Sequence, residues 1–146
     1  MSNTRRPNTK YQEPFCLAID IPEAADADVT ELVMVIPTGK SLRVDQVQYV
    51  NPTGLAGHGT NFAHISLFKD STEMYRWNTD SNDATGSIAG TASEGTIAAA
   101  TFVDLTASPT DAALVAEATD VLSIVINESG TTTVPAGRVV IRGRWV

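Results

Sequence analysis

The hydrophobic and polar positions along the chain alternate with a period of two, as they do in β-strands. Short segments rich in Val, Ile, Thr and aromatic residues are separated by Gly, Pro, Asn, Asp or Ser. They predict strands at residues 15–20, 29–36, 42–50, 61–69, 73–78, 101–105, 120–127 and 138–146. Eight short strands in one domain are typical of a sandwich or a barrel. We therefore expect an all-β, single-domain antiparallel β-sandwich.

The segments between these strands contain recurring turn signals. Pro and Gly occur two residues apart in 37–39, 52–54 and 135–137, which is the pattern of a type I turn. Residues 108–117 begin Ser-Pro-Thr-Asp and leave a short helix and a loop equally open. Residues 79–100 are rich in Gly, Ser, Thr and Ala, so we expect a long surface loop or a weak edge strand there.

The last predicted strand differs on its two faces. Alternation directs one set of side chains toward the core: Val139, Ile141, Gly143 and Trp145. It directs the other set outward: Arg138, Val140, Arg142 and Arg144. The outward arginines would form a basic stripe, and Gly143 between two of them indicates a bulge or a close backbone approach.

The net charge of −7 is unevenly distributed. The two ends hold six basic residues and no acid: Arg5, Arg6, Lys10, Arg138, Arg142 and Arg144. The rest of the chain has seventeen acids against four bases, a charge of −13, which would repel nucleic acid. The basic ends favour docking on an acidic protein surface, although solvated segments that balance local acids would look the same.

The first residues have no hydrophobic pattern of their own. We expect residues 1–14 to be an extended N-terminal arm and residues 15–146 to be the folded domain. The chain contains neither a secretory signal pattern nor an apolar run long enough for a membrane span, so we expect no membrane partner and no export. The single cysteine, Cys16, lies in an apolar run, where a buried thiol is expected.

Groups with reactive chemistry are few. His58 lies between glycines and His64 lies within a strand, and neither has neighbours at a metal-binding spacing. No nucleophile or phosphate-binding motif is present, so we expect no enzyme, no cofactor and no metal site. Asp26 and Asp28 could flank a calcium ion together with Glu23, but an acidic turn is the usual meaning of such a run.

The aromatic residues leave one binding function open. Tyr75 and Trp77 share a strand face and could form a sugar-stacking platform, with Trp145 as a further candidate. An ordinary sandwich core also explains these rings. A carbohydrate-binding module would require at least two of them to be exposed and coplanar.

Several phrases resemble those of a known group of proteins. They are Asn51-Pro52-Thr53-Gly54, Asn61-Phe62, Trp77-Asn78-Thr79-Asp80, the strand from Asp120 to Ile126, and Pro135-Ala136-Gly137-Arg138 running into Gly143-Arg144-Trp145-Val146. In this order they resemble head decoration, or cement, proteins of tailed bacteriophages, which are of jelly-roll type. The phrases are turns and strands rather than chemical signatures.

The resemblance implies a jelly-roll structural protein with neither a catalytic site nor a cofactor. Such proteins bind the outer surface of the capsid as trimers and clamp neighbouring major capsid subunits, so this one would be made in the host cytoplasm and end on the virion. The expected contacts with the capsid or with neighbouring copies are Arg5, Arg6, Lys10, Arg138, Arg142 and Arg144. A tail or head-fibre structural protein and a carbohydrate-binding module are the alternatives.

Overall fold

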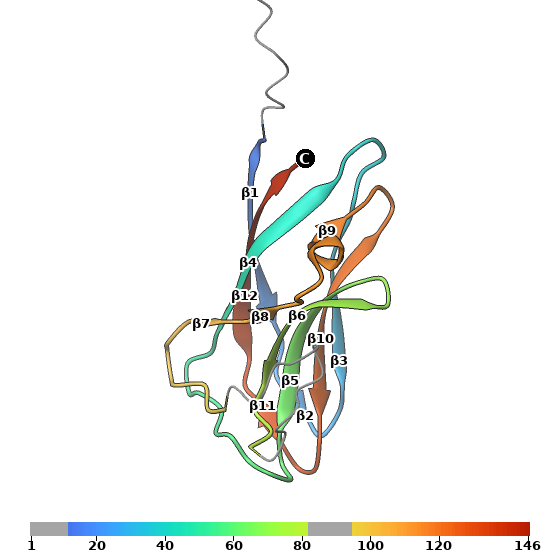
Figure 1. Cartoon of the computed structure of the whole chain (residues 1–146). Helices are drawn as coiled ribbons and strands as arrows, with labels where there is room; N and C mark the ends of the chain where they lie inside the picture. Colours follow the sequence, from blue (N-terminus) through green and yellow to red (C-terminus); the bar gives the residue numbers. More distant parts are fainter. Residues whose placement is uncertain (1–11, 82–94) are drawn as a thin grey trace, which may run out of the picture.

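The computed structural model describes residues 12–81 and 95–146, which form two antiparallel sheets packed as a sandwich (Figure 1). The first sheet, called sheet I, has the order β1 (Pro14–Ile21), β12 (Gly137–Trp145), β4 (Leu42–Val50) and β7 (Val103–Asp104), and β9 (Val115–Ala116) also pairs with β4. Sheet II has the order β3 (Val29–Val35), β10 (Val121–Glu128), β5 (Ala63–Lys69), β6 (Thr72–Asn78) and β8 (Thr106–Ala107). A third, two-stranded sheet pairs β2 (Ala24–Ala25) with β11 (Thr133–Val134). The expected all-β antiparallel sandwich is confirmed.

The strand order is that of a jelly roll. Strand β1 pairs with β12, β3 with β10, β4 with β7 and β5 with β6, so the chain forms a long antiparallel ribbon closed by the β5–β6 hairpin. Successive crossings of the ribbon lie alternately in sheet I and sheet II, which rolls it into the two layers of the sandwich. The start of β1 and the C-terminus consequently lie at the same end of the molecule (Figure 1).

Each predicted strand overlaps an observed one. The segment 101–105 is reduced to the short strand β7, and β8 follows it in the other sheet. The helical pattern at 108–117 becomes a single 3₁₀ turn, Asp111–Leu114. Of residues 79–100, positions 82–94 lie outside the described residues, whereas Ile97 is buried and forms an isolated bridge to Leu55. Of the two expected alternatives, a purely surface loop is therefore wrong around Ile97, and a weak edge strand is reduced there to a single bridge.

The core lies between the sheets and is made by the inward positions of the alternating strands. On β4 the buried residues are Leu42 and Val44, then Val47 and Tyr49, so the alternation slips by one residue in the middle of the strand. At this slip the pairing with β12 shifts between Arg142 and Gly143, which is a β-bulge. The bulge that the sequence indicated at Gly143 is confirmed, and a Cβ there would overlap the carbonyl oxygen of Arg43.

The expectation of a buried Cys16 is wrong. In β1, Phe15, Leu17 and Ile19 are partly buried, whereas Cys16 and Ala18 alternate with them and are exposed. The apolar run around Cys16 suggested burial, but Cys16 and Ala18 occupy outward positions of the strand that also hold uncharged residues. The strand itself begins at Pro14, and the carbonyl of Glu13 accepts a hydrogen bond of 2.9 Å from the Trp145 amide.

Replacing Gly143 by Ala tests the bulge. We expect the free energy of unfolding to fall by about 3 kcal/mol, because the added methyl group must displace the β4 backbone. Gly39→Ala is the matched control: no atom lies within 4 Å of its Cβ position, so only the positive φ of 79° costs about 1 kcal/mol. Urea unfolding measures both, and equal losses for the two variants would contradict the close approach at Gly143.

Candidate partner-binding face

The arginines of β12 lie on the outer face of sheet I. Residues of β12 that point inward are buried, including Val139 and Ile141, and Arg138 and Arg142 alternate with them and are exposed. Arg144 follows the bulge, with 43% of its side chain exposed. Val140 also lies on the outer face and is nevertheless nearly covered, between Ala18 and Gln48 in register.

Arg138 is paired with an acid of the neighbouring strand. Its Nε donates to Oδ1 of Asp20 on β1 at 2.9 Å, and the two side chains are 56% and 80% exposed. Because both ends of this pair are in water, it contributes little to stability, at most about 1 kcal/mol. The two charges remain accessible to a partner.

Arg142 belongs to a polar network that crosses three strands. Its Nη1 donates to Oε1 of Gln48 at 2.6 Å and to Oε1 of Gln46 at 3.3 Å. Both glutamines donate in turn from Nε2 to Oδ1 of Asp104 on β7, at 3.0 Å from Gln46 and 2.9 Å from Gln48. The contacts of Arg142 on this face are therefore neutral amides, and no carboxylate lies within ion-pair distance of it among the described residues.

Arg144 joins a separate charge cluster at the bulge. Its Nη2 lies 3.7 Å from Oδ1 of Asp45, and Nε of Arg43 lies 3.5 Å from the same oxygen. Arg43 also donates from Nη2 to Oδ1 of Asp111 at 2.6 Å, and this bond lowers the pKa of the Asp111 carboxyl. The three arginines thus share a face, but acids and amides accompany them, and they do not form an unopposed basic stripe.

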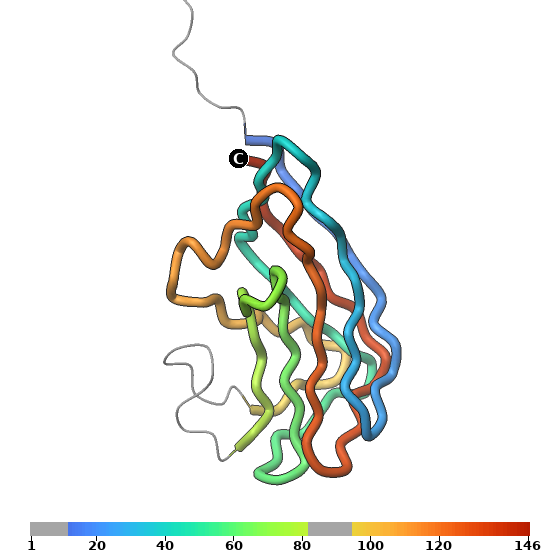
Figure 2. Tube along the Cα trace, turned by 90° about the vertical axis from the view of Figure 1, so that its right-hand side faces the viewer, coloured from blue at the N-terminus to red at the C-terminus, as the bar shows by residue number. Residues whose placement is uncertain are grey.

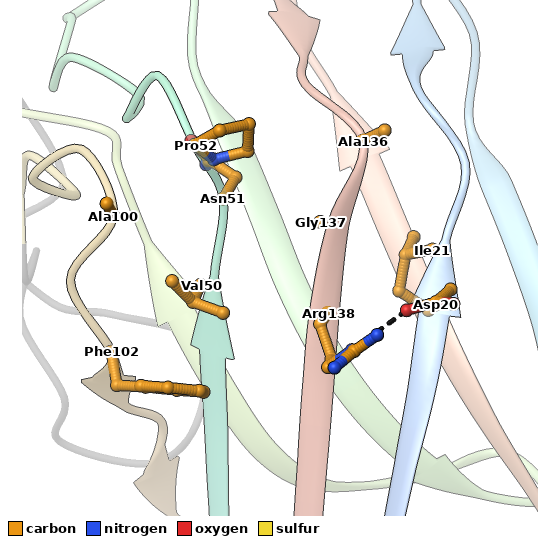
Figure 3. A pocket seen from close by; sticks show the side chains of 10 residues that line it. All are labelled: Asp20, Ile21, Val50, Asn51, Pro52, Ala100, Phe102, Ala136, Gly137 and Arg138. Carbon is orange, nitrogen blue, oxygen red and sulfur yellow. Dashed lines mark hydrogen bonds and ion pairs between the residues drawn. The ribbon is translucent and has the colours of Figure 1, made fainter.

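A pocket of about 530 Å³ opens beside Arg138 on the same face (Figure 3). Its apolar lining comes from β1, β4, the turn after β4, the loop before β7 and the segment before β12; the residues are Ile21, Val50, Pro52, Ala100, Phe102 and Ala136. Asp20 and Arg138 form the opposite side from Phe102, whose ring is 50% exposed. A pocket of this size, mostly apolar with a few polar groups, can hold a ligand or a partner side chain.

Hydrogen bonds of the Asn51 side chain hold one wall of the pocket. Its Oδ1 accepts from the amides of Thr53 (3.1 Å) and Gly54, which closes the Pro52 turn, and its Nδ2 donates to the Tyr49 hydroxyl at 3.3 Å. That hydroxyl donates to the carbonyl of Pro135 at 3.3 Å and so connects the Pro52 turn with the segment before β12. Burial raises the pKa of Tyr49, so the hydroxyl stays a donor.

Glycine forms the floor of the pocket. A Cβ on Gly137 would lie 2.6 Å from the Val50 carbonyl oxygen and 2.8 Å from the Tyr49 hydroxyl. A larger residue would therefore push β12 away from β4. Two of the recurring Pro-x-Gly phrases, at 52–54 and 135–137, line this pocket. The type I turn expected at all three phrases is not general: the turn near Gly39 runs from Pro37 to Lys40 with Gly39 at a positive φ of 79°, as in a type II turn, and Gly137 is already the first residue of β12.

Sequence reasoning placed Arg138 in the site but missed Phe102, Asp20 and Asp104. Alternation in 101–105 contains the signal for two of them: Leu105 is buried and Val103 partly buried, so Phe102 and Asp104 point outward. An aromatic residue at an outward position would have marked the face. The other residues expected in the contact, Arg5, Arg6 and Lys10, lie outside the described residues.

The three rings considered for sugar stacking do not form a platform. Tyr75 is buried, its hydroxyl donates to the Val44 carbonyl at 2.8 Å, and burial raises its pKa to about 12. Trp77 is partly buried in sheet II and donates from Nε1 to the Gly95 carbonyl at 3.0 Å. Trp145, in sheet I, packs edge-on against Phe15 with ring centroids 5.5 Å apart.

The acidic turn considered for calcium is used to join loops. Glu128, at the end of β10, accepts from the Ala27 amide at 2.9 Å and the Val134 amide at 3.3 Å, and its own amide donates to Asp28 at 2.9 Å. Across residues 12–81 and 95–146, no group of three or more His, Cys, Asp or Glu side chains could hold a metal ion. The acidic turn thus has a structural use.

Comparison of the sequence with models of protein families finds no match, and comparisons with curated proteins and with solved structures find none either. Within the part of the chain that the structure describes, no helix is long and apolar enough to cross a membrane. The functional argument therefore depends on the residues and surfaces of this chain.

The Glu128 contact predicts a pH dependence. Burial raises the pKa of Glu128 above the 4.5 of a free glutamate, with Asp26 and Asp28 adding to the effect, although the two backbone hydrogen bonds oppose it. The folded state then binds a proton more readily than the unfolded state, so the contribution of this carboxyl to stability is present below pH 4.5 and is lost as pH rises through the folded pKa.

Glu128→Gln removes this titration and keeps an acceptor oxygen. We expect the free energy of unfolding of the native chain, relative to that of the variant, to decrease between about pH 4 and about pH 8. Urea unfolding across this range measures it, and the comparison cancels the titration of all other groups. A difference that is constant with pH, or that increases, would contradict the raised pKa.

Proposed function

We propose that this protein is a virion structural protein, a decoration or cement protein that binds the outer surface of a bacteriophage head. In this proposal it associates with itself as a homotrimer, contacts the major capsid protein and stabilises neighbouring capsid subunits. It has no catalytic role and needs no cofactor. A structural protein of the tail or of a head fibre is the nearest alternative within the same class.

The observation that carries the proposal is the composition of the outer face of sheet I. An apolar pocket with a half-exposed Phe102 lies beside an exposed ion pair and a network of arginine, glutamine and aspartate side chains. Protein interfaces combine an apolar centre with a polar, hydrogen-bonding rim in this way. The jelly-roll order is also used by viral capsid domains, which agrees with the resemblance seen in the sequence phrases.

The partners of the three arginines determine which of them is most available to bind an acidic partner. The charges of Arg138 and Arg144 are shared with Asp20 and Asp45, whereas the partners of Arg142 among residues 12–81 and 95–146 are amides. Arg142 can exchange its amide contacts for a carboxylate of the capsid without leaving another acid unpaired. We therefore assign the charge-dependent part of capsid binding chiefly to Arg142.

Charge reversal tests this assignment. Arg142→Glu should weaken binding to empty capsids about tenfold or more at low salt, with a smaller effect at high salt because salt screens exposed charges. Lys40→Glu makes the same change of charge in the turn before β4, where Lys40 lies over the ring of core-side Trp145 and not beside Arg142, and it should have little effect on capsid binding. Binding that is equal for both variants would contradict the role of Arg142.

Removal of residues 1–11 tests the basic arm separately. We expect capsid binding to weaken about tenfold or more, because Arg5, Arg6 and Lys10 are lost. The free energy of unfolding should change by less than about 0.5 kcal/mol, because Glu13 and β1 are retained. Co-sedimentation with empty capsids gives the affinity, and unchanged binding would remove the arm from the proposal.

A carbohydrate-binding module is a second candidate, and the pocket is the observation that favours it. The Phe102 ring faces Asp20 and Arg138 across the pocket, so a sugar could stack on the ring and bind the two charged groups through hydroxyls. This site differs from the three-ring platform that the sequence suggested.

Phe102→Ala separates the two functions. If the protein is a decoration protein, the variant should bind capsids at least about thirtyfold more weakly, as expected for an aromatic residue at the centre of an interface. Nuclear magnetic resonance titration of the native chain with a panel of saccharides should then show no shift at the pocket. Saccharide binding that Phe102→Ala abolishes, together with unchanged capsid binding, would favour the second candidate.

A further inference from the structure

The outer face of sheet II differs in character from that of sheet I. Residues opposite one another in register share a face, and Leu122, Ile124 and Ile126 of β10 point into the core. The outward positions on β3, β10 and β5 are Thr30, Leu32, Val35, Val121, Ser123, Val125, Asn127, His64, Ser66 and Phe68. None of these is an acid, a lysine or an arginine, and we call this surface the neutral face. Figure 2 shows the strands side by side, with β3 at the edge of the sheet.

Among the described residues, the neutral face also holds the two most exposed of the large apolar side chains. Leu32 is 62% and Val35 is 51% exposed, more than Phe102 or Val146. Leu32 lies in one row with Ser123 and Phe68 across the three strands, so the small Ser123 stands between the two larger side chains. Exposed apolar residues that are contiguous, with polar groups around them, are typical of association surfaces.

We propose that the neutral face is where copies of this chain pack against each other. Copies with a charge of −7 repel one another, and around a symmetry axis the residues nearest the axis approach their counterparts in neighbouring copies. Such a self-contact is most favourable where no charge is present. The acids and bases of sheet I instead suit a partner with its own charge pattern. The inference rests on the self-association included in the proposed function and assigns it to a surface.

The association uses the face of the sheet and not its open edge. Glu31 of β3 lies opposite core-facing Ile124, so the edge strand carries a charged residue on its inward side, and a bulge at Val33 interrupts its pairing. Both features are known to discourage the addition of another strand to an edge. Because sheet I faces the other way, a copy can bind its neighbour through sheet II and leave the pocket open to the capsid.

Leu32→Lys in the full chain tests the inference, since it places a charge at the most exposed apolar position of the neutral face. We expect the native chain to sediment as an oligomer. The dissociation constant of the oligomer should be at least about thirtyfold higher for the variant than for the native chain. Thr38→Lys, with the same added charge in an exposed turn, should sediment like the native chain. A monomeric native chain at all concentrations, or an unchanged oligomer for Leu32→Lys, would overturn the inference.

Cross-linking gives a second test that does not depend on the lysine variant folding. Leu32→Cys in a Cys16→Ser background should form intermolecular disulfides under mild oxidation, and Thr38→Cys in the same background should not. Equal cross-linking of the two would overturn the inference. Capsid binding is measured separately. If the Leu32→Lys variant dissociates but still binds capsids, the self-contact is supported. If the native chain is an oligomer that fails to bind capsids, the result counts against the proposed function alone.

Discussion

The pairing of the last strand with the first is the constraint on which the rest of the structure depends. Strand β12 lies between β1 and β4, so sheet I has no continuous hydrogen bonding until the end of the chain is in place. This pairing joins residues more than a hundred positions apart, and such distant contacts make folding slow. It also creates the candidate site, because Asp20, Arg138 and the Gly137 floor of the pocket come together only when β12 is inserted.

The two faces of the sandwich then have different chemistry, although the same alternation produces both. On sheet I the outward positions hold arginine, glutamine and aspartate around an apolar pocket. On sheet II the outward positions of three strands hold no acid, lysine or arginine, and Glu73 and Arg76 of β6 are paired at 2.8 Å and mostly covered. The two proposed contacts, with the capsid and with other copies, would use one face each, and the opposite placement of the faces would let them coexist.

Much of the fold could be predicted from the sequence, because a period of two is a local signal. It located the strands, the outward arginines and the glycine of the bulge. It failed where the burial or the partner of a side chain is determined by residues distant in the sequence. Cys16 is exposed although its sequence neighbours are apolar, and Arg138 and Arg142 have partners from other strands, Asp20 and Gln48, that no local pattern identifies. The outward position of Phe102 could be predicted from the alternation around it. The pocket beside it could not, because it forms only where the segments after β4, before β7 and before β12 meet.

Electron cryo-microscopy of empty phage capsids incubated with the protein tests the central claim most directly. The account predicts additional density on the outer surface of the head, into which the sandwich fits with sheet I and its pocket against the capsid and the neutral face between adjacent copies. Density confined to the tail or a fibre would contradict the account, as would a bound sandwich whose sheet I faces solvent.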